Sequence, residues 1–108
     1  MLRIDPDISK EDLKRVKDKS FEVDLHGMGT LEALNRLRFI VRFCPESTRG
    51  IYVIHGFNLG TSIRDAITVK SLQSKRVKCI SRVFNNDGQS VIVFKGHEDD
   101  LDKHVLFG

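Results

Sequence analysis

The sequence predicts a two-layer α/β domain with a mixed four-stranded sheet, in the order βαβαββ, preceded by a short N-terminal helix. Two strand-like segments are each followed by apolar residues at helical spacing, and a strand–helix–strand connection requires a parallel pair. Two further strand-like segments flank an Asn-Asn-Asp-Gly turn, which adds an antiparallel hairpin. A chain of 108 residues is the size of one hydrophobic core, so one domain is expected.

Residues 1–20 are predicted to form a leader whose regular element is a helix over Lys10–Lys19. Ser9 is a suitable N-cap, and Ile8 and Leu13 occupy the positions of a hydrophobic staple. Lysine and arginine crowd the polar side of this helix. We therefore expect the leader to dock only lightly on the rest of the domain.

The body of the domain begins with a strand over Phe21–His26, in which apolar and polar residues alternate. This alternation is typical of a strand with one buried face, and it places Asp24 and His26 together on the other face. A helix follows, which Thr30 can cap and Pro45 ends.

The second half of the body repeats the strand–helix order and then closes with the hairpin. A β-branched, aromatic run over Ile51–His55 predicts a buried strand. Residues 62–72 are predicted to be helical, and Val77–Phe84 pairs with Ser90–Lys95 in the hairpin. The body thus spans residues 21–95, and an acidic tail spans residues 96–108.

Charge favours a polyanionic partner. The net charge is +3; four acids and one lysine give the tail −3, which leaves +6 on residues 1–95. A basic body attracts nucleic acid, although a solvated surface of mixed charge explains this number equally well. The same alternatives apply to a group of cations that could line a phosphate track: Arg64, Lys70, Lys75, Arg76, Lys78 and Arg82.

The sequence points to the cytoplasm. No apolar run approaches the roughly 20 residues that cross a bilayer, and the N-terminus lacks the basic and apolar regions of a signal peptide. Cys44 and Cys79 lie far apart in apolar surroundings, so free, buried thiols are expected. We expect a monomer with no membrane contact.

Both predicted parallel strands end in His-Gly, at His26–Gly27 and at His55–Gly56. In open α/β sheets, ligands bind outside the carboxyl ends of the strands, so both histidines belong to that edge. The helix that starts near Thr61 offers unpaired N–H groups and a positive dipole end to a phosphate. Two hydrogen-bonded structural histidines are the alternative interpretation.

Several motifs, in one order, resemble the Smr (small MutS-related) family. Val23–Gly27, followed by Leu31–Ala33 at the start of a helix, resembles the family's LDLHG motif and its EA-containing helix. Val53–Gly56, the helix from Ile63 and the strand Gly88–Val93 resemble the second motif and the last strand. The resemblance covers nearly all of the domain body.

Similarity to this family implies a fold like that of the C-terminal domain of translation initiation factor three, and an association with DNA or RNA. Some members nick DNA or cleave RNA. The positions carried over by motif are Asp24, His26, Gly27, His55, Gly56 and Gly60.

If the domain cleaves a phosphodiester, one histidine would act as general base and the other as general acid, and Arg64 would stabilise the developing charge. Asp24 could orient His26 or hold a divalent metal, although a solvated carboxylate fits equally well. Mg²⁺ is the cofactor to expect if cleavage needs a metal. No metal site is predicted, because Asp24 is the only carboxylate in the motifs near the site.

The second motif departs from the family pattern HGxGxG, in which a lysine follows the first glycine. Here it resembles the HGxNxGT loop of small stand-alone members, with Phe57 in place of the lysine and Asn58 able to adopt a left-handed turn. Phe57 could stack on an unpaired base or fold over the next helix. The predicted nucleic-acid contacts are Gly27, Gly56, Phe57, Asn58, Gly60, Thr61 and Arg64.

Two functions follow from these observations. The first is a nucleic-acid-binding Smr-like domain, for which endonuclease activity is an open question. The alternative is a non-catalytic adaptor that docks on a protein or ribonucleoprotein partner. Binding through phosphates weakens steeply with salt, whereas apolar docking does not, so salt dependence separates the two. A third hypothesis is an enzyme that acts on a small phosphate-containing molecule, but the sequence contains no P-loop or dinucleotide-binding motif to support it.

Overall fold

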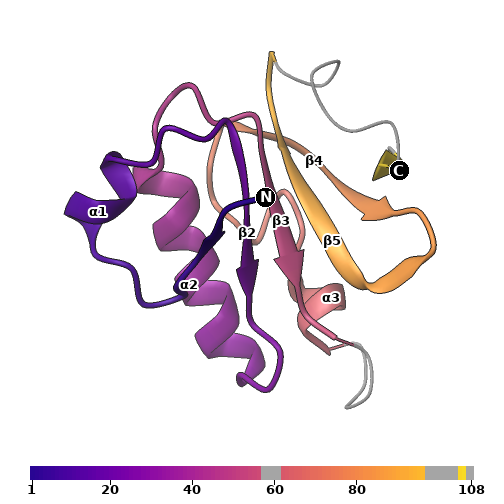
Figure 1. Cartoon of the computed structure of the whole chain (residues 1–108). Coiled ribbons are helices and arrows are strands. Elements are labelled where there is room, and N and C mark those ends of the chain that lie inside the picture. Colours follow the sequence, from indigo (N-terminus) through magenta and orange to yellow (C-terminus); the bar gives the residue numbers. More distant parts are fainter. Residues whose placement is uncertain (57–61, 97–104, 107–108) are drawn as a thin grey trace.

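A mixed sheet and a layer of helices make up the computed structural model, which describes residues 1–56, 62–96 and 105–106 (Figure 1). Within these ranges, three helices and six strands are present. In chain order they are β1 (Arg3–Ile4), α1 (Lys10–Lys14), β2 (Ser20–Asp24), α2 (Thr30–Phe43), β3 (Gly50–Ile54), α3 (Ser62–Ala66), β4 (Val77–Val83), β5 (Asn86–Phe94) and β6 (Val105–Leu106).

The sheet has the strand order β1-β2-β3-β5-β4-β6. β1, β2 and β3 are parallel to one another, and the remaining neighbours are antiparallel. The predicted mixed sheet and hairpin are therefore confirmed, but the predicted count of four strands was too low. The two additional strands, β1 and β6, are two residues long and lie at the two edges. Segments this short carry too little alternation to be recognised in a sequence.

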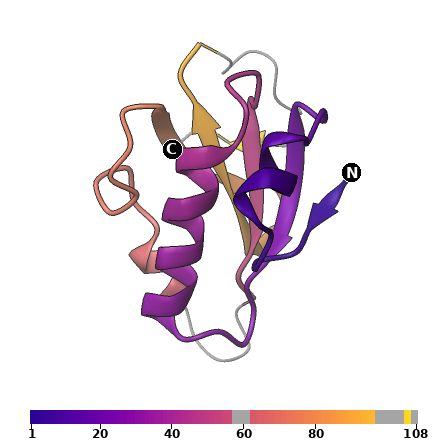
Figure 2. The same cartoon turned by 90° about the vertical axis from the view of Figure 1, so that its left-hand side faces the viewer.

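All three helices lie on one face of the sheet, as the two-layer prediction requires; α2 lies in front of the sheet in Figure 2. The main core fills the space between these layers and contains the buried helical side chains. We call this side the helix face. A smaller cluster of strand residues, centred on Tyr52, Val91 and Val93, is buried on the opposite side, the second face.

The helix of the leader is shorter than predicted, and the leader packs more firmly against the rest of the domain. Ser9 caps α1 as expected, because its side chain accepts a hydrogen bond of 3.1 Å from the backbone N–H of Asp12. The helix ends at Lys14 rather than Lys19, where the N–H groups of Arg15 and Val16 bond back only three residues. Leu13 is fully buried in the main core, so the light docking predicted for this segment was wrong.

Helix α2 follows the predicted apolar stripe closely. Its inward face buries Ala33, Leu37, Ile40 and Val41. Thr30 is the first helical residue rather than the cap, since Gly29 occupies the N-cap position without a side-chain bond. The helix ends just before Pro45, as expected.

Helix α3 is much shorter than the predicted span of residues 62–72. Thr68 and Ser71 exchange two backbone-to-side-chain hydrogen bonds of 2.9 Å, and the Ser71 hydroxyl donates to the Ala66 carbonyl at 2.7 Å. Serine and threonine side chains compete with the helical backbone in this way. The helix therefore stops at Ala66 and a bonded turn replaces its second half.

The hairpin turns earlier than predicted. Val83 pairs with Asn86, so the turn consists of Phe84 and Asn85, and Asn85 has a φ of 59°. Asparagine tolerates this left-handed conformation better than most residues. β5 consequently starts at Asn86 instead of Ser90.

The structure also shows the environments of the two cysteines and of Arg76. Cys44 is buried as expected, whereas Cys79 is only half-buried, and both thiols are free. Arg76, a member of the predicted phosphate track, donates to three carbonyls at the end of α2, so its guanidinium is already occupied. No helix in the described ranges is both long enough and apolar enough to span a membrane.

Candidate functional site

The two His-Gly segments lie side by side at one end of the sheet, as predicted. Asp24 pairs with Ile54 in the last register position of β2 and β3, and the Leu25 N–H donates to the Ile54 carbonyl at 2.8 Å. A Cβ atom added to Gly56 would lie 3.4 Å from the Cβ of His26. The β4–β5 turn is at the same end, because β5 runs antiparallel to β3 (Figure 1).

Backbone geometry explains the glycine in each pair. Gly27 has a φ of 82° and Gly56 a φ of 71°, a region that residues with a Cβ adopt only with strain. The Gly56 N–H also donates to the Gly88 carbonyl at 3.0 Å, which ties this turn to β5. The two predicted glycine positions thus form the tight turns that end the strands.

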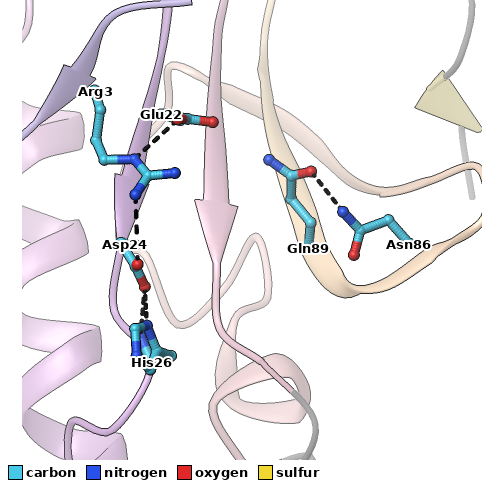
Figure 3. Close-up of polar contacts among 6 residues, drawn as sticks. All are labelled: Arg3, Glu22, Asp24, His26, Asn86 and Gln89. Atoms are coloured by element: carbon cyan, nitrogen blue, oxygen red, sulfur yellow. Dashed lines mark hydrogen bonds and ion pairs between the residues drawn. The ribbon is translucent and has the colours of Figure 1, made fainter.

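Asp24 holds the ring of His26 on the second face. Its Oδ1 atom accepts a bond of 3.1 Å from the His26 backbone N–H and one of 2.5 Å from the ring Nδ1–H (Figure 3). The other oxygen, Oδ2, lies 3.8 Å from a guanidinium nitrogen of Arg3. Arg3 in turn donates to Glu22 at 2.9 Å. The His26 side chain is 69% exposed, so an oriented imidazole faces the surroundings.

The charge state of Asp24 follows from these contacts. Partial burial raises the pKa of this carboxyl, but the hydrogen bonds from the ring and backbone of His26 and the charges of His26 and Arg3 outweigh it, so the pKa lies below its ordinary value. Because Asp24 is then an acceptor only, Nδ1 of His26 carries the proton. Nε2 has no partner among the described residues and remains available to a ligand.

His55 has the opposite environment. It is 5% exposed, its Nδ1–H donates to the Gly56 carbonyl at 2.9 Å, and its Nε2 accepts from the Ser90 hydroxyl at 2.8 Å. Burial lowers its pKa, and the charges of Arg64 and Arg82 lower it further against the opposing effects of the Gly56 bond and Asp65. The ring is therefore neutral, with both nitrogens satisfied.

The two histidine side chains lie on opposite faces of the sheet. Ser90, the partner of His55, alternates with the core residues Ile92 and Phe94 and belongs to the helix face. Asp24, the partner of His26, alternates with core residues of β2 and belongs to the second face. The predicted edge is thus shared by both residues, while their rings diverge.

Replacement of His55 by a residue that does not titrate is expected to reduce the loss of folding stability at acid pH. Because burial holds its folded pKa below the ordinary histidine value of 6.5, the unfolded chain takes up the proton first, and stability is lost as pH falls from about 6.5 towards the folded pKa. We expect urea unfolding of His55→Gln to depend less on pH between about 7.5 and about 5.5 than that of the wild type. His26→Gln, at an exposed position, is the control that should keep the His55 contribution. An unchanged pH dependence in His55→Gln would contradict this account.

Two arginines from different elements bring positive charge to this end of the sheet. Arg64, on α3, has a buried Nε atom with no hydrogen-bond partner among the described residues, 3.5 Å from a carboxylate oxygen of Asp65. Arg82 lies opposite Ser90 in the β4–β5 register and is exposed. Its side chain makes no hydrogen bond or ion pair with any described residue. Both charges lower the pKa of His55, whereas the charge of Asp65, which pairs with Arg64, opposes them.

Sequence reasoning missed two residues of this arrangement, Ser90 and Arg3. Ser90 had a signal, since it is a polar residue at a core-facing position of an otherwise apolar strand. Arg3 had none, because it meets Glu22 and Asp24 only through the pairing of β1 with β2. Among the predicted contacts, Phe57, Asn58, Gly60 and Thr61 lie outside the described residues. The described ranges contain no group of three or more potential metal ligands.

No family model matches the chain, and no curated protein or solved structure matches it either. The resemblance to the Smr family, with the fold and activity it implies, stays a prediction.

Proposed function

We propose that this chain is a Smr-like nucleic-acid-binding domain whose binding surface is the end of the sheet where β2 and β3 end. The observation that carries the proposal is the exposed Arg82, which makes no hydrogen bond or ion pair with any described residue, on the helix face of this edge, with the exposed ring of His26 on the second face of the same edge. Guanidinium groups are well suited to phosphate. The Gly27 and Gly56 turns allow a ligand to approach the backbone closely.

The order of the central elements supports the same proposal. β2, α2, β3, α3, β4 and β5 follow the predicted βαβαββ order, which the resemblance to Smr domains and to the C-terminal domain of translation initiation factor three implies. The His-Gly ends of the first two of these strands lie together, as a shared ligand edge requires.

We further propose that the domain acts as an endonuclease through His26. Asp24 fixes the Nδ1–H of this ring, so Nε2 can exchange a proton with the attacking or leaving oxygen of a phosphodiester. His55, neutral and bonded at both nitrogens, is better suited to hold the Gly56 turn against β5. Arg64 and Arg82 lie on the helix face with His55, so they would bind neighbouring phosphates of the strand rather than the phosphate at His26.

Salt dependence tests the binding proposal. Wild-type affinity for labelled DNA and RNA oligonucleotides, measured by fluorescence anisotropy, is expected to fall steeply with salt. Arg82→Gln should weaken binding about 3- to 10-fold and reduce the salt slope by about 1, since one phosphate contact is lost. Lys95→Gln is the matched control, because Lys95 is an exposed cation just beyond the opposite end of β5.

The same measurement separates the adaptor alternative. Absence of salt-sensitive binding by a folded wild-type protein would contradict the nucleic-acid proposal and favour a protein partner. Equal losses in Arg82→Gln and Lys95→Gln would indicate general charge attraction and contradict the assignment to this end of the sheet.

A further inference from the structure

We propose that Phe84 stacks on an unpaired base, so that the nucleic acid bound at this site is single-stranded there. This inference rests on the proposed function and specifies its substrate class. Phe84 is 55% exposed at the tip of the β4–β5 hairpin, although phenylalanine is one of the residues most often buried. The chain therefore presents a large aromatic side chain at the end of the sheet that carries the candidate site.

The hairpin holds this aromatic side chain in a defined place. Val83 and Asn86 are paired, and the left-handed Asn85 completes the two-residue turn between them. The Asn86 side chain accepts from the Gly88 N–H at 3.1 Å. It also donates to the Gln89 side-chain oxygen at 3.1 Å, which Figure 3 shows. A side chain on such a bonded turn loses less entropy on binding than one on an open loop.

The strand register connects Phe84 to the candidate site. Arg82, two residues before it, lies opposite Ser90, which bonds His55. His55 is followed by Gly56, which packs beside His26. β4 and β2 are separated by three strand spacings, about 14 Å in all. A short single strand can span this distance, with a base on Phe84 and its backbone near Arg82.

Polar groups suited to base edges lie between these two points. Gln89 pairs with Ile54, which pairs with Asp24, so all three belong to the second face, whereas Arg82, opposite Ser90, belongs to the helix face. The strand would therefore cross the end of the sheet, with its backbone at Arg82 and its bases towards Gln89. Since the Gln89 oxygen accepts from Asn86, its amide N–H groups remain as donors. Asparagine and glutamine amides are common partners of base edges.

An unpaired base fits this surface better than a duplex. Stacking on an aromatic side chain requires a base whose face is not already covered by its neighbours in a helix. Within β4 and β5 the charged residues are Lys78, Arg82 and Asp87. The single acid, Asp87, follows the turn on the β5 side, so phosphates are expected on the Arg82 side.

Phe84→Trp provides a direct test, because the chain contains no other tryptophan. Titration with single-stranded DNA or RNA is expected to quench its fluorescence and to leave the affinity at least as high as in the wild type, whereas a duplex of the same sequence should quench it weakly. Phe84→Leu, which keeps an apolar side chain without a ring, should bind single strands about 5- to 100-fold more weakly. Val69→Trp, at an exposed position in the turn after α3, is the control whose fluorescence should not change.

Failure of this inference can be told apart from failure of the proposed function. If Phe84→Leu binds like the wild type while Arg82→Gln still weakens salt-sensitive binding, the stacking contact is wrong and the nucleic-acid proposal stands. Preference for a duplex over a single strand would also overturn the inference. If the folded wild type binds no nucleic acid, both proposals are wrong.

Discussion

Replacement of Arg76 by methionine is expected to lower the free energy of unfolding by about 3 kcal/mol. The guanidinium donates to the carbonyls of Val41, Cys44 and Pro45 at 2.8, 2.9 and 2.8 Å, and it lies 4.8 Å above the ring of Phe94. The last carbonyls of a helix have no intrahelical donor, and Pro45 prevents the usual glycine cap. Methionine keeps the apolar stem but leaves these carbonyls without their donor.

Urea unfolding followed by circular dichroism measures this effect. Lys75→Met is the matched control, since Lys75 is the exposed neighbour and should change stability by less than about 0.5 kcal/mol. Arg76→Lys should recover only part of the loss, because a single ammonium group does not reproduce the planar fork of arginine. A loss in Arg76→Met no larger than that of the control would show that the three hydrogen bonds contribute little to stability.

Replacement of His26 by alanine is expected to reduce phosphodiester cleavage about 10²- to 10⁴-fold, if the endonuclease proposal is correct. The exposed Nε2 of this ring is the proton-exchanging group of the proposal, and alanine removes it. Asp24→Asn should also reduce cleavage, because an amide no longer holds the Nδ1–H through a charged hydrogen bond. Glu22→Gln, which alters the Arg3 contact without touching His26, should retain most of the activity.

The assay is cleavage of supercoiled plasmid and of a structured RNA by the purified protein, with and without Mg²⁺. Cleavage that persists in His26→Ala would place the chemistry elsewhere. A folded wild type that binds in a salt-sensitive manner but cleaves neither substrate would mean that the domain is a binding module. In that case Asp24 and His26 would contribute to recognition alone.

The elements predicted best are those whose own residues determine them. The boundaries of α2 follow from its apolar stripe and Pro45, and β2 and β3 follow from their alternating or β-branched runs. The end of α3 was missed because Thr68 and Ser71 bond each other and the Ala66 carbonyl. This competition between side chain and backbone is local, but periodicity does not reveal which partner wins.

In the candidate site, too, the features that depend on neighbouring residues were predictable, and those that depend on distant residues were not. The pairing of Asp24 with His26 was one of the predicted alternatives, because residues two positions apart on a strand share a face; in the structure β2 ends at Asp24 and His26 follows in the turn. The neutral state of His55 was not predictable, since it depends on Ser90 from β5, on Arg82 from β4 and on burial beneath the helices. Only the fold brings these groups together.

The sequence alone thus determined the layer architecture and the His-Gly edge, because residues near one another in the chain produce these features, and it offered the orientation of His26 by Asp24 as one alternative. The tertiary structure decided that the two histidines have different environments, that Arg76 serves the end of α2, and that Phe84 is presented beside the site. Each of these depends on strand register and on burial, which residues distant in the sequence determine jointly.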